Sequence, residues 1–360
     1  MRFSLTSLVR LVGLLGFAVC GLAITLARLE PDAARFRVGT PPQYDLVNGF
    51  IIDPAGAPSR WLDVDSGETL PVGLPEGEQV NYASCAPWQD EEGKTQVVGR
   101  WNDHVRTPSG ILARRFGIVR FTIPGGEVLD RISLEVLPTS QPCWFPGMKS
   151  RVLFGGCDGR LYTLDFDGPA RTGETPAPTQ VVWRVPAPGG QLMLRDPVWP
   201  ADPRFRGRVL VALSYTTPES QGELCPSQLW WLDLDSRGTS ILGAGRVTDE
   251  PLTPNSREER FPNVVVDADG RTTIAFLTQT DEKSRWELRV APLRFEGQDE
   301  LPAVRKGEAR LLTRDHLTTL PPFSADGRHI NAIVREGFSP RAVTRFMRFS
   351  TASADQPPRG

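Results

Sequence analysis

Pro197-Val198-Trp199 is the stretch of sequence on which the fold assignment depends, because a proline beside an aromatic residue recurs along the chain at similar intervals. The pattern also stands at Pro87-Trp88 and at Pro142-Cys143-Trp144. It returns in a looser form at Phe261-Pro262-Asn263-Val264 and at Pro321-Pro322-Phe323, and the successive proline spacings are 55, 55, 65 and 59 residues. Spacings this regular indicate a chain built from repeated structural units.

Each unit reads as four short strands, because apolar and polar residues alternate over short runs between Asp-Gly, Ser-Gly, Pro-Gly and Gly-Gly turns. The 34 glycines and 33 prolines among 360 residues exceed average usage, as expected for a chain with many tight turns. The strands predicted for the second unit are Gln141–Phe145, Arg151–Gly155, Leu161–Phe166 and Gln180–Val185. Those predicted for the third and fourth units are Pro197–Trp199, Val209–Ser214, Gln228–Leu234, Ser240–Gly245, Asn263–Val266, Thr272–Thr278, Trp286–Arg294 and Ala309–Thr313.

Four antiparallel strands in every 55–65 residues, with no helical periodicity between them, are typical of a β-propeller blade. The sequence therefore predicts an all-β protein, a β-propeller of six four-stranded blades with five or seven as alternatives, preceded by one N-terminal hydrophobic helix. Amino- and carboxy-terminal strands are expected to combine in one blade that closes the ring, because closure removes exposed strand edges. The aromatic residue of each first strand is expected to fill the wedge between neighbouring sheets.

Two of these stretches resemble a known family of repeats. Asp196-Pro197-Val198-Trp199-Pro200-Ala201-Asp202 and the run from Pro321 to Ile330 are similar to the Pro-x-aromatic-Ser-x-Asp-Gly core of WD40-like Pro-Asp propeller repeats. Such repeats form the carboxy-terminal domain of TolB-like proteins. The run from Gly155 to Asp165 also resembles the strand turn of quinoprotein-type blades. The resemblance implies a propeller fold, and it implies little about activity because many unrelated functions occur on propellers.

Residues 1–29 predict a membrane anchor or an export signal. They contain three arginines and no acidic residue, and a 17-residue apolar stretch runs from Leu11 to Ala27. An uncleaved signal anchor, in contact with the membrane through residues 8–29, gives a single-pass cell-membrane protein with an extracytoplasmic propeller. Cleavage near Gly21-Leu22-Ala23 gives a secreted or periplasmic protein instead. The expected segments are the anchor or signal peptide at 1–29, a linker at 30–45, the propeller at 46–349 and a disordered tail at 350–360.

Four of the five cysteines lie downstream of the predicted export segment, and an even number in an exported chain suggests two disulfides. Cys85 and Cys143 stand at or near the starts of two consecutive inner strands, and Cys157 and Cys225 stand in two consecutive loops between second and third strands. We therefore expect one disulfide joining Cys85 to Cys143 and another joining Cys157 to Cys225. Buried, unpaired thiols are the alternative.

The residues just before each inner strand are the candidates for a binding site, because propellers commonly bind ligands at the mouth of the central funnel. They mix donors, acceptors and both signs of charge, which suits a polar ligand or a peptide. The candidate binding residues are Tyr82, Gln141, Arg195, Asp196, Arg260 and Thr319. The alternative is that these are ordinary loop residues that hydrate the channel.

The net charge and the motifs that the sequence lacks limit the classes of function that we expect. The formal net charge is −2, and removal of residues 1–29 leaves 38 basic and 43 acidic residues, so no nucleic-acid partner is expected. Neither a metal-ligand spacing around the three histidines nor a nucleophile elbow is present, and no cofactor, metal site or catalytic residue is predicted. The sequence favours a non-enzymatic binding module for a protein, peptide or glycan partner at the cell envelope. The alternative is an enzyme, such as a polysaccharide hydrolase or lyase, whose carboxylates converge only in three dimensions.

Overall fold

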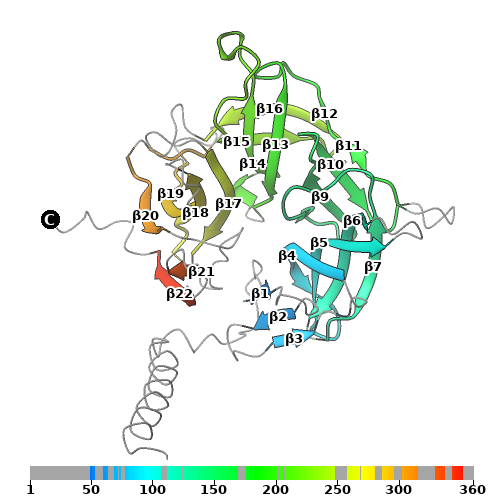
Figure 1. Ribbon diagram of the computed structural model, residues 1–360. Coiled ribbons are helices and arrows are strands. Elements are labelled where there is room, and N and C mark those ends of the chain that lie inside the picture. Colours follow the sequence, from blue (N-terminus) through cyan, green and yellow to red (C-terminus); the bar gives the residue numbers. More distant parts are fainter. Residues whose placement is uncertain are drawn as a thin grey trace, which may run out of the picture.

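Six β-sheets contain the strands of the described residues, and they stand around a common centre (Figure 1). The computed structural model describes residues 49–52, 60–63, 69–71, 73, 78–106, 112–123, 125–168, 176–200, 203–205, 207–247, 258–267, 269–279, 286–295, 302–305, 307–314, 329–336 and 343–351. Within these ranges the only helical elements are two short 3₁₀ turns, η1 (Pro203–Phe205) and η2 (Pro218–Ser220). The all-β prediction is therefore confirmed.

Four of the sheets have four or five strands, and each is one blade. Blade 1 comprises β4 (Glu78–Gln89), β5 (Thr95–Arg106), β6 (Leu112–Ile123) and β7 (Val128–Ser133), and blade 2 comprises β8 (Cys143–Trp144), β9 (Arg151–Gly155), β10 (Leu161–Asp165) and β11 (Thr179–Gln180). Blade 3 comprises β13 (Leu192–Val198), β14 (Arg208–Tyr215), β15 (Gln228–Leu234), β16 (Ser240–Arg246) and the added strand β12 (Val182–Trp183). Blade 4 comprises β17 (Glu258–Val266), β18 (Thr272–Gln279), β19 (Trp286–Pro292) and β20 (Arg310–Thr313).

The two remaining sheets are smaller and come from opposite ends of the described chain. One contains β1 (Gly49–Ile52), β2 (Arg60–Asp63) and β3 (Thr69–Pro71), and the other pairs β21 (His329–Glu336) with β22 (Val343–Ser350). Strand β1 packs beside β4 of blade 1, while the β21–β22 sheet packs against blade 4. Among the described residues these two sheets are separate, and the structure shows a propeller arrangement with four complete blades.

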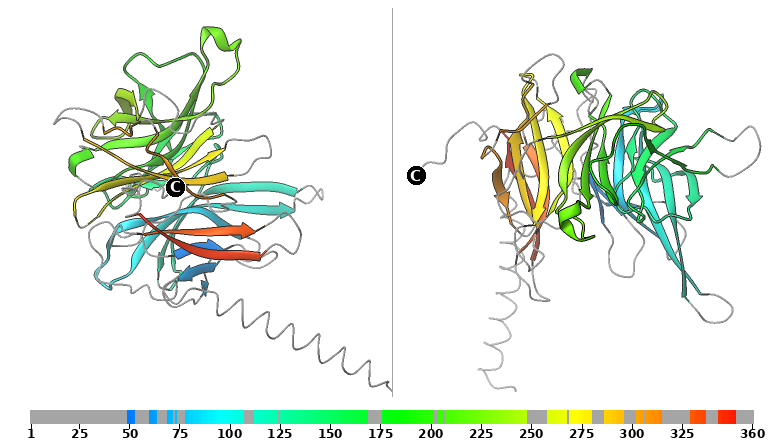
Figure 2. Two further views of the ribbon diagram at one scale, coloured as in Figure 1. Left: turned by 90° about the vertical axis from the view of Figure 1, so that its left-hand side faces the viewer. Right: turned by 90° about the horizontal axis from the view of Figure 1, so that it is seen from above.

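The blades are stacked on one another because each sheet is apolar on both faces. In blade 2, Leu153 packs toward blade 3, while its neighbour Phe154 packs toward blade 1, and both side chains are fully buried. Blade 3 repeats this pattern, because Val211 faces blade 2 and Leu210 faces blade 4. Figure 2 shows the strands of blades 3 and 4 lying side by side. This burial on both faces explains why Val152–Phe154 and Val209–Leu213 are unbroken apolar runs rather than the alternating pattern expected from the sequence.

The tryptophans of the proline motif lie between blades, as predicted. Trp144 is 5% exposed and packs edge-on against Trp88 of blade 1, with ring centroids 5.0 Å apart. Trp199 of blade 3 packs against Phe145 of blade 2 at 4.1 Å. Large aromatic side chains therefore fill the space between diverging sheets.

The inner strands of blades 3 and 4 begin earlier than the sequence predicted. The predicted starts were Pro197 and Asn263, whereas β13 begins at Leu192 and β17 at Glu258. Each strand carries a bulge at its proline, between Arg195 and Val198 in β13 and between Arg260 and Asn263 in β17. Proline has no N–H for a ladder hydrogen bond, and a bulge on an edge strand accommodates it without ending the strand.

The predicted strand Gln180–Val185 is in fact divided between two blades. Thr179 and Gln180 form β11 at the outer edge of blade 2, and Val182 and Trp183 form β12, which pairs in parallel with β16 of blade 3. The backbone N–H of Val181 still donates to Leu161, but that of Val182 donates to Thr239. The segment that leaves blade 2 thus pairs with the outer edge of blade 3. The alternation of apolar and polar residues in a sequence does not show to which sheet a strand belongs.

The expected disulfides are not formed, because Cys143, Cys157 and Cys225 are all free thiols. Cys143 is 6% exposed and packs beside Leu153 in the apolar layer between blades 2 and 3, where burial raises the pKa of its thiol to about 12. Cys157 is exposed in the β9–β10 turn, and Cys225 lies in the loop before β15. These two loops contact the inner strand of the following blade rather than each other: Gly159 accepts from the N–H of Leu194, and Ser227 from that of Glu259.

The predicted anchor at 1–29 and linker at 30–45 lie outside the described residues, as do residues 352–360 of the predicted tail. Strand β22 continues to Ser350, one residue beyond the predicted end of the propeller, and Thr351 is 7% exposed. No helix within the described ranges is long and apolar enough to cross a membrane.

The third strands of blades 2 and 3 each carry a Leu-Asp pair near their end, Leu164-Asp165 and Leu232-Asp233, and the aspartate forms a cross-strand ion pair. Asp165 at the end of β10 pairs with Arg151 at the start of β9, at 2.8 Å, and also accepts from Ser150 Oγ. Asp233 in β15 pairs with Arg208 in β14 in the same way. Burial acts to raise the pKa of Asp165, but the hydrogen bonds from Arg151, Ser150 and the Asp167 N–H outweigh it and leave that pKa below its usual value.

We therefore predict that Asp165 stabilises the fold in a pH-dependent way. A carboxyl group whose pKa is lowered by folding adds stability above its unfolded pKa of about 4, and this stability is lost as the pH falls through the folded pKa. Asp165→Asn should reduce the free energy of unfolding at pH 7, measured with urea, and the difference from wild type should shrink toward pH 3. The exposed neighbour Asp167→Asn is the matched control. A difference for Asp165→Asn that stays constant from pH 7 to pH 3 would contradict the prediction.

Candidate functional site

The proline repeat places two sets of equivalent residues on neighbouring inner strands. Ser140, Arg195 and Arg260 each stand two residues before the proline of their unit. Gln141, Asp196 and Phe261 stand immediately before it. In blades 3 and 4 the pre-proline residue has the same unusual backbone, with φ of 53° at Asp196 and 51° at Phe261. The repeat thus places residues of three consecutive blades, most of them polar, at equivalent positions before the proline of each unit.

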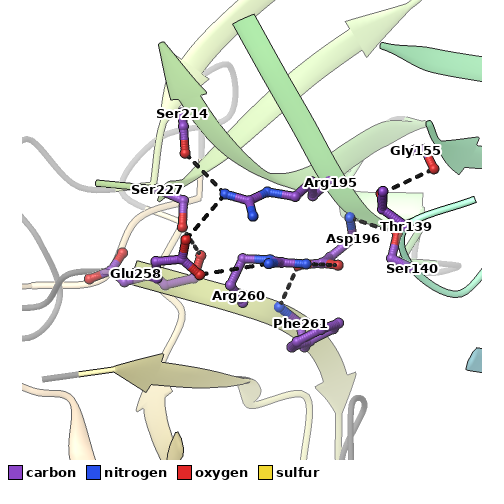
Figure 3. Close-up of polar contacts among 11 residues, drawn as sticks. Thr139, Ser140, Gly155, Arg195, Asp196, Ser214, Ser227, Glu258, Arg260 and Phe261 are labelled. Carbon is purple, nitrogen blue, oxygen red and sulfur yellow. Dashed lines mark hydrogen bonds and ion pairs between the residues drawn. The ribbon is translucent and has the colours of Figure 1, made fainter. Parts of the chain in front are cut away.

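Asp196 is at the centre of this group and is completely buried. Its carboxylate accepts hydrogen bonds from Nε and Nη2 of Arg260, and from the backbone N–H of Phe261 at 3.1 Å (Figure 3). Its own N–H donates to Ser140 Oγ at 3.0 Å. Asp196 therefore connects blade 2 on one side with blade 4 on the other.

The left-handed backbone at Asp196 is what makes both connections possible. Residues before proline normally have extended backbone, and a left-handed conformation outside glycine costs about 1–3 kcal/mol. Here the conformation places the N–H against Ser140 and the carboxylate against Arg260. A doubly hydrogen-bonded carboxylate–guanidinium pair is among the stronger polar interactions in proteins, and it offsets this strain.

A second ion pair lies beside the first. Arg195 Nη2 donates to Ser214 Oγ at 3.2 Å and approaches Glu258 Oε1 at 3.5 Å, while Arg260 Nη1 lies 3.7 Å from Glu258 Oε2. Glu258 is the most exposed member of the group, with 30% of its side chain accessible. We call Ser140, Gln141, Arg195, Asp196, Ser214, Glu258 and Arg260 the inner-strand cluster.

Two groups in the inner-strand cluster are buried without a hydrogen-bond partner. Nε of Arg195 has none among the described residues, and neither does the side-chain amide of Gln141, a residue that is 1% exposed. Burial lowers the pKa of the Arg195 guanidinium, and repulsion from Arg260 adds to the decrease. Six other buried side-chain atoms of the described residues also lack a hydrogen-bond partner, among them the indole N–H groups of Trp88 and Trp199. Such groups commonly mark a place where a water molecule or an ion completes the bonding.

The structure brings together three of the predicted binding residues, namely Arg195, Asp196 and Arg260, and Gln141 directly follows Ser140, whose Oγ accepts from the Asp196 N–H. Tyr82 lies in β4 of blade 1, and Thr319 lies outside the described residues. Sequence reasoning missed Glu258 and Ser214, which bond to Arg195 from β17 and β14. Glu258 stands two residues before Arg260 in an alternating strand, and that spacing could have indicated a shared face.

The chemistry open to the inner-strand cluster is recognition by hydrogen bonds and charge. The Asp196 and Glu258 carboxylates each contact at least one arginine. No group of three or more His, Cys, Asp or Glu side chains suited to a metal ion occurs in the part of the chain that the structure describes. An arrangement of arginines, hydroxyls and an amide suits polar ligand binding.

Comparison with known proteins identifies no family for the chain. No family model matches the sequence, and no curated protein matches it. Among solved structures, it is similar to a mannose phosphorylase from Leishmania mexicana at 13% identity, over 79% of this chain and 87% of that chain, with a TM-score of 0.37. It is also similar to a glucose dehydrogenase at 12% identity, over 80% of this chain and 90% of that chain, with a TM-score of 0.41. Its similarity to the carboxy-terminal WD40 domain of Sif2 is 10% identity, over 79% of this chain and 85% of that chain, with a TM-score of 0.32. TM-scores this low carry no functional conclusion, and the propeller assignment rests on the sheets of the chain itself.

We predict that Asp196 and Arg260 form an energetically coupled pair. Asp196→Asn tolerates the left-handed backbone but removes the buried carboxylate charge that Arg260 contacts, and the Glu258 carboxylate, 3.7 Å from Arg260 Nη1, offsets only part of that loss. The substitution should cost up to about 3–5 kcal/mol of stability. In the double variant with Arg260→Met, the loss should be smaller than the sum of the two single losses by about 0.5–3 kcal/mol. Denaturant unfolding of the four proteins measures this coupling.

The control is the more exposed pair between Asp233 and Arg208, in which 45% of the aspartate side chain is accessible. Asp233→Asn should cost less than about 1 kcal/mol because solvent screens this ion pair. Equal losses for Asp196→Asn and Asp233→Asn, or strictly additive losses in the double variant, would show that the buried pair does not couple the blades.

Proposed function

We propose that this protein is a non-enzymatic β-propeller that binds a polar peptide or glycan segment at the inner-strand cluster. The observation that carries the proposal is the pair of unpartnered buried groups, the Gln141 amide and the Arg195 Nε. Each is the sequence neighbour of the hydrogen-bonded pair formed by Ser140 and Asp196. The unused donors and the unused acceptor therefore belong to one small region between blades 2 and 3.

The chemistry of these groups indicates the kind of ligand. A primary amide offers two donors and one acceptor, and it complements a peptide bond or a pair of sugar hydroxyls. The Arg195 Nε adds a donor that suits a carbonyl or carboxylate oxygen of the ligand. Peptides and glycans both present such groups at close spacing, whereas an apolar ligand would leave the Gln141 amide unsatisfied.

An enzymatic role as a polysaccharide hydrolase or lyase is the alternative. Glycoside hydrolysis needs one protonated and one ionised carboxyl group on either side of the scissile bond. In the inner-strand cluster, the carboxylates of Asp196 and Glu258 both contact Arg260. The cluster therefore supports binding more strongly than it supports acid–base catalysis.

The proposal makes an unusual prediction for Gln141→Leu. If the amide is kept for a ligand, its removal should raise the free energy of unfolding by about 1 kcal/mol, because an unsatisfied buried group is lost, and should weaken ligand binding at least tenfold. Stability is measured by denaturant unfolding, and binding by screening the full-length chain, in detergent, on arrays of glycans and of peptides.

Gln191→Leu, which changes an exposed glutamine just before β13, is the control and should bind as wild type does. A destabilised Gln141→Leu variant would show that the amide serves the fold. Arrays that show no bound peptide or glycan, or equal binding by wild type and Gln141→Leu, would overturn the proposed site.

We further propose that residues 8–29 hold the propeller at the outer side of the cell membrane. The apolar stretch from Leu11 to Ala27 supports this proposal, because it continues past the possible cleavage site at Gly21-Leu22-Ala23. The expected result of cell fractionation is an intact chain in the membrane pellet after an alkaline carbonate wash. A soluble chain whose first residue follows Ala23 would show a cleaved signal peptide instead.

Six blades of the Pro-Asp repeat type are part of the same proposal. The β1–β3 sheet beside blade 1 and the β21–β22 sheet beside blade 4 support this proposal, because they lie next to the first and the last of the four blades (Figure 1). The bulged pre-proline residues Asp196 and Phe261 support the assignment of a common repeat, because the two units share this backbone feature as well as their sequence pattern.

A further inference from the structure

A cleft of about 300 Å³ lies at the other end of β17 from the inner-strand cluster. It is bounded by η1 of blade 3, the β17–β18 turn, the end of β19 and the residue after β22. Its lining residues are Arg204, Asp267, Gly270, Arg271, Thr272, Thr273, Pro292, Leu293, Arg294, Phe295 and Thr351. Its volume is at the lower end of the roughly 300–1,000 Å³ of small-molecule sites, and a ligand of monosaccharide size would suit it.

The charges around this cleft are predominantly positive. Three arginines line it against a single carboxylate, that of Asp267. The Oδ1 atom of Asp267 already accepts the backbone N–H groups of Asp269 and Arg271, both at 2.9 Å. Arg294 is paired with Glu308, at 2.9 Å from Nη2 to Oε1, and that carboxylate offsets its charge. Arg204 and Arg271 therefore line the cleft together with one carboxylate, that of Asp267.

The side chains of Arg204 and Arg271 differ in how they are held. Arg204 donates from Nη1 to the carbonyl of Gly270 at 3.1 Å and from Nη2 to Thr272 Oγ1 at 3.2 Å, and its guanidinium lies 5.1 Å from the centre of the Phe295 ring. These contacts fix its orientation. Arg271 is exposed, and its guanidinium has no hydrogen-bond or ion-pair partner among the described residues. One arginine is thus positioned in advance, and the other is available to close on a ligand.

We propose that this cleft is a second binding site, specific for a small ligand that carries a sulfate or phosphate ester. Guanidinium groups match tetrahedral oxyanions because they offer parallel N–H donors as well as charge. The hydroxyl groups of Thr272 and Thr273 line the same cleft and suit the remaining polar atoms of a sugar-sized ligand. Leu293 and Pro292 supply apolar wall.

Inorganic sulfate and inorganic phosphate are the probes for the test. Each is titrated into the full-length chain by calorimetry at low ionic strength, with chloride at matched ionic strength as the reference. We expect saturable binding of at least one oxyanion by wild type and at least tenfold weaker binding by Arg271→Gln. The tighter of the two anions indicates whether the natural ligand is a sulfate ester or a phosphate ester.

Arg237→Gln, in the exposed β15–β16 turn of blade 3, is the matched control and should bind like wild type. Arg271→Gln should fold normally, because its exposed side chain has no partner to lose. The site is overturned if neither oxyanion binds better than chloride, or if Arg271→Gln binds as tightly as Arg237→Gln. The proposed peptide or glycan site lies at the opposite end of the inner strands, and its test uses Gln141→Leu. Failure of that proposal would therefore not affect the result of the oxyanion titrations.

Discussion

Every blade of this protein depends on its neighbours, because each sheet is apolar on both faces. Successive residues of a strand point to opposite faces, so the fully buried neighbours Leu153 and Phe154 require apolar partners on both sides of blade 2. Blade 3 supplies one partner surface and blade 1 the other. A single four-stranded sheet of this composition would expose most of its apolar surface to water. The stacking of sheets around a centre is therefore the condition under which any one of them is stable.

Directional contacts then set how one blade meets the next. The residue three positions before the proline donates its N–H to the loop between the second and third strands of the preceding blade, at Leu194 to Gly159 and again at Glu259 to Ser227. Two residues later, the left-handed backbone turns the Asp196 side chain toward Arg260 of the next blade. Hydrophobic burial is non-directional and cannot by itself set this register. The repeated hydrogen bonds and the buried ion pair are directional, and they can set the register of one blade against the next.

The same geometry distinguishes polar groups that satisfy one another from polar groups that have no partner among the described residues. Asp196 and Arg260 satisfy one another, and their burial suits a fixed role between blades. Gln141 and the Arg195 Nε are equally enclosed but lack partners, which is costly unless something else completes their bonding. At the far end of β17, by contrast, Arg271 is exposed and unpaired, and retaining it there costs little. Two different physical situations thus point to two different kinds of binding surface.

The pattern of apolar and turn residues predicted the bounds of a strand correctly where the strand's own residues and its flanking turns determine them. The predicted strands Arg151–Gly155 and Gln228–Leu234 match β9 and β15 residue for residue, because both are middle strands with turns at each end. The pattern failed where a distant segment decides. The split between β11 and β12 depends on an outer edge that blade 3 offers, and the free thiols of Cys157 and Cys225 depend on which loop meets which strand.

The sequence by itself determined the all-β class, the repeat of about sixty residues and the prolines that mark each inner strand, because these follow from alternation and from turn residues close together in the chain. It also indicated that Gln141 is equivalent to Asp196, immediately before the proline, and that Arg195 is equivalent to Arg260, two residues before it. Only the tertiary structure decided that Asp196 pairs with Arg260, 64 residues away, and that Gln141 is left without a partner. Such pairings depend on how sheets pack across a ring, and no spacing along one strand encodes them.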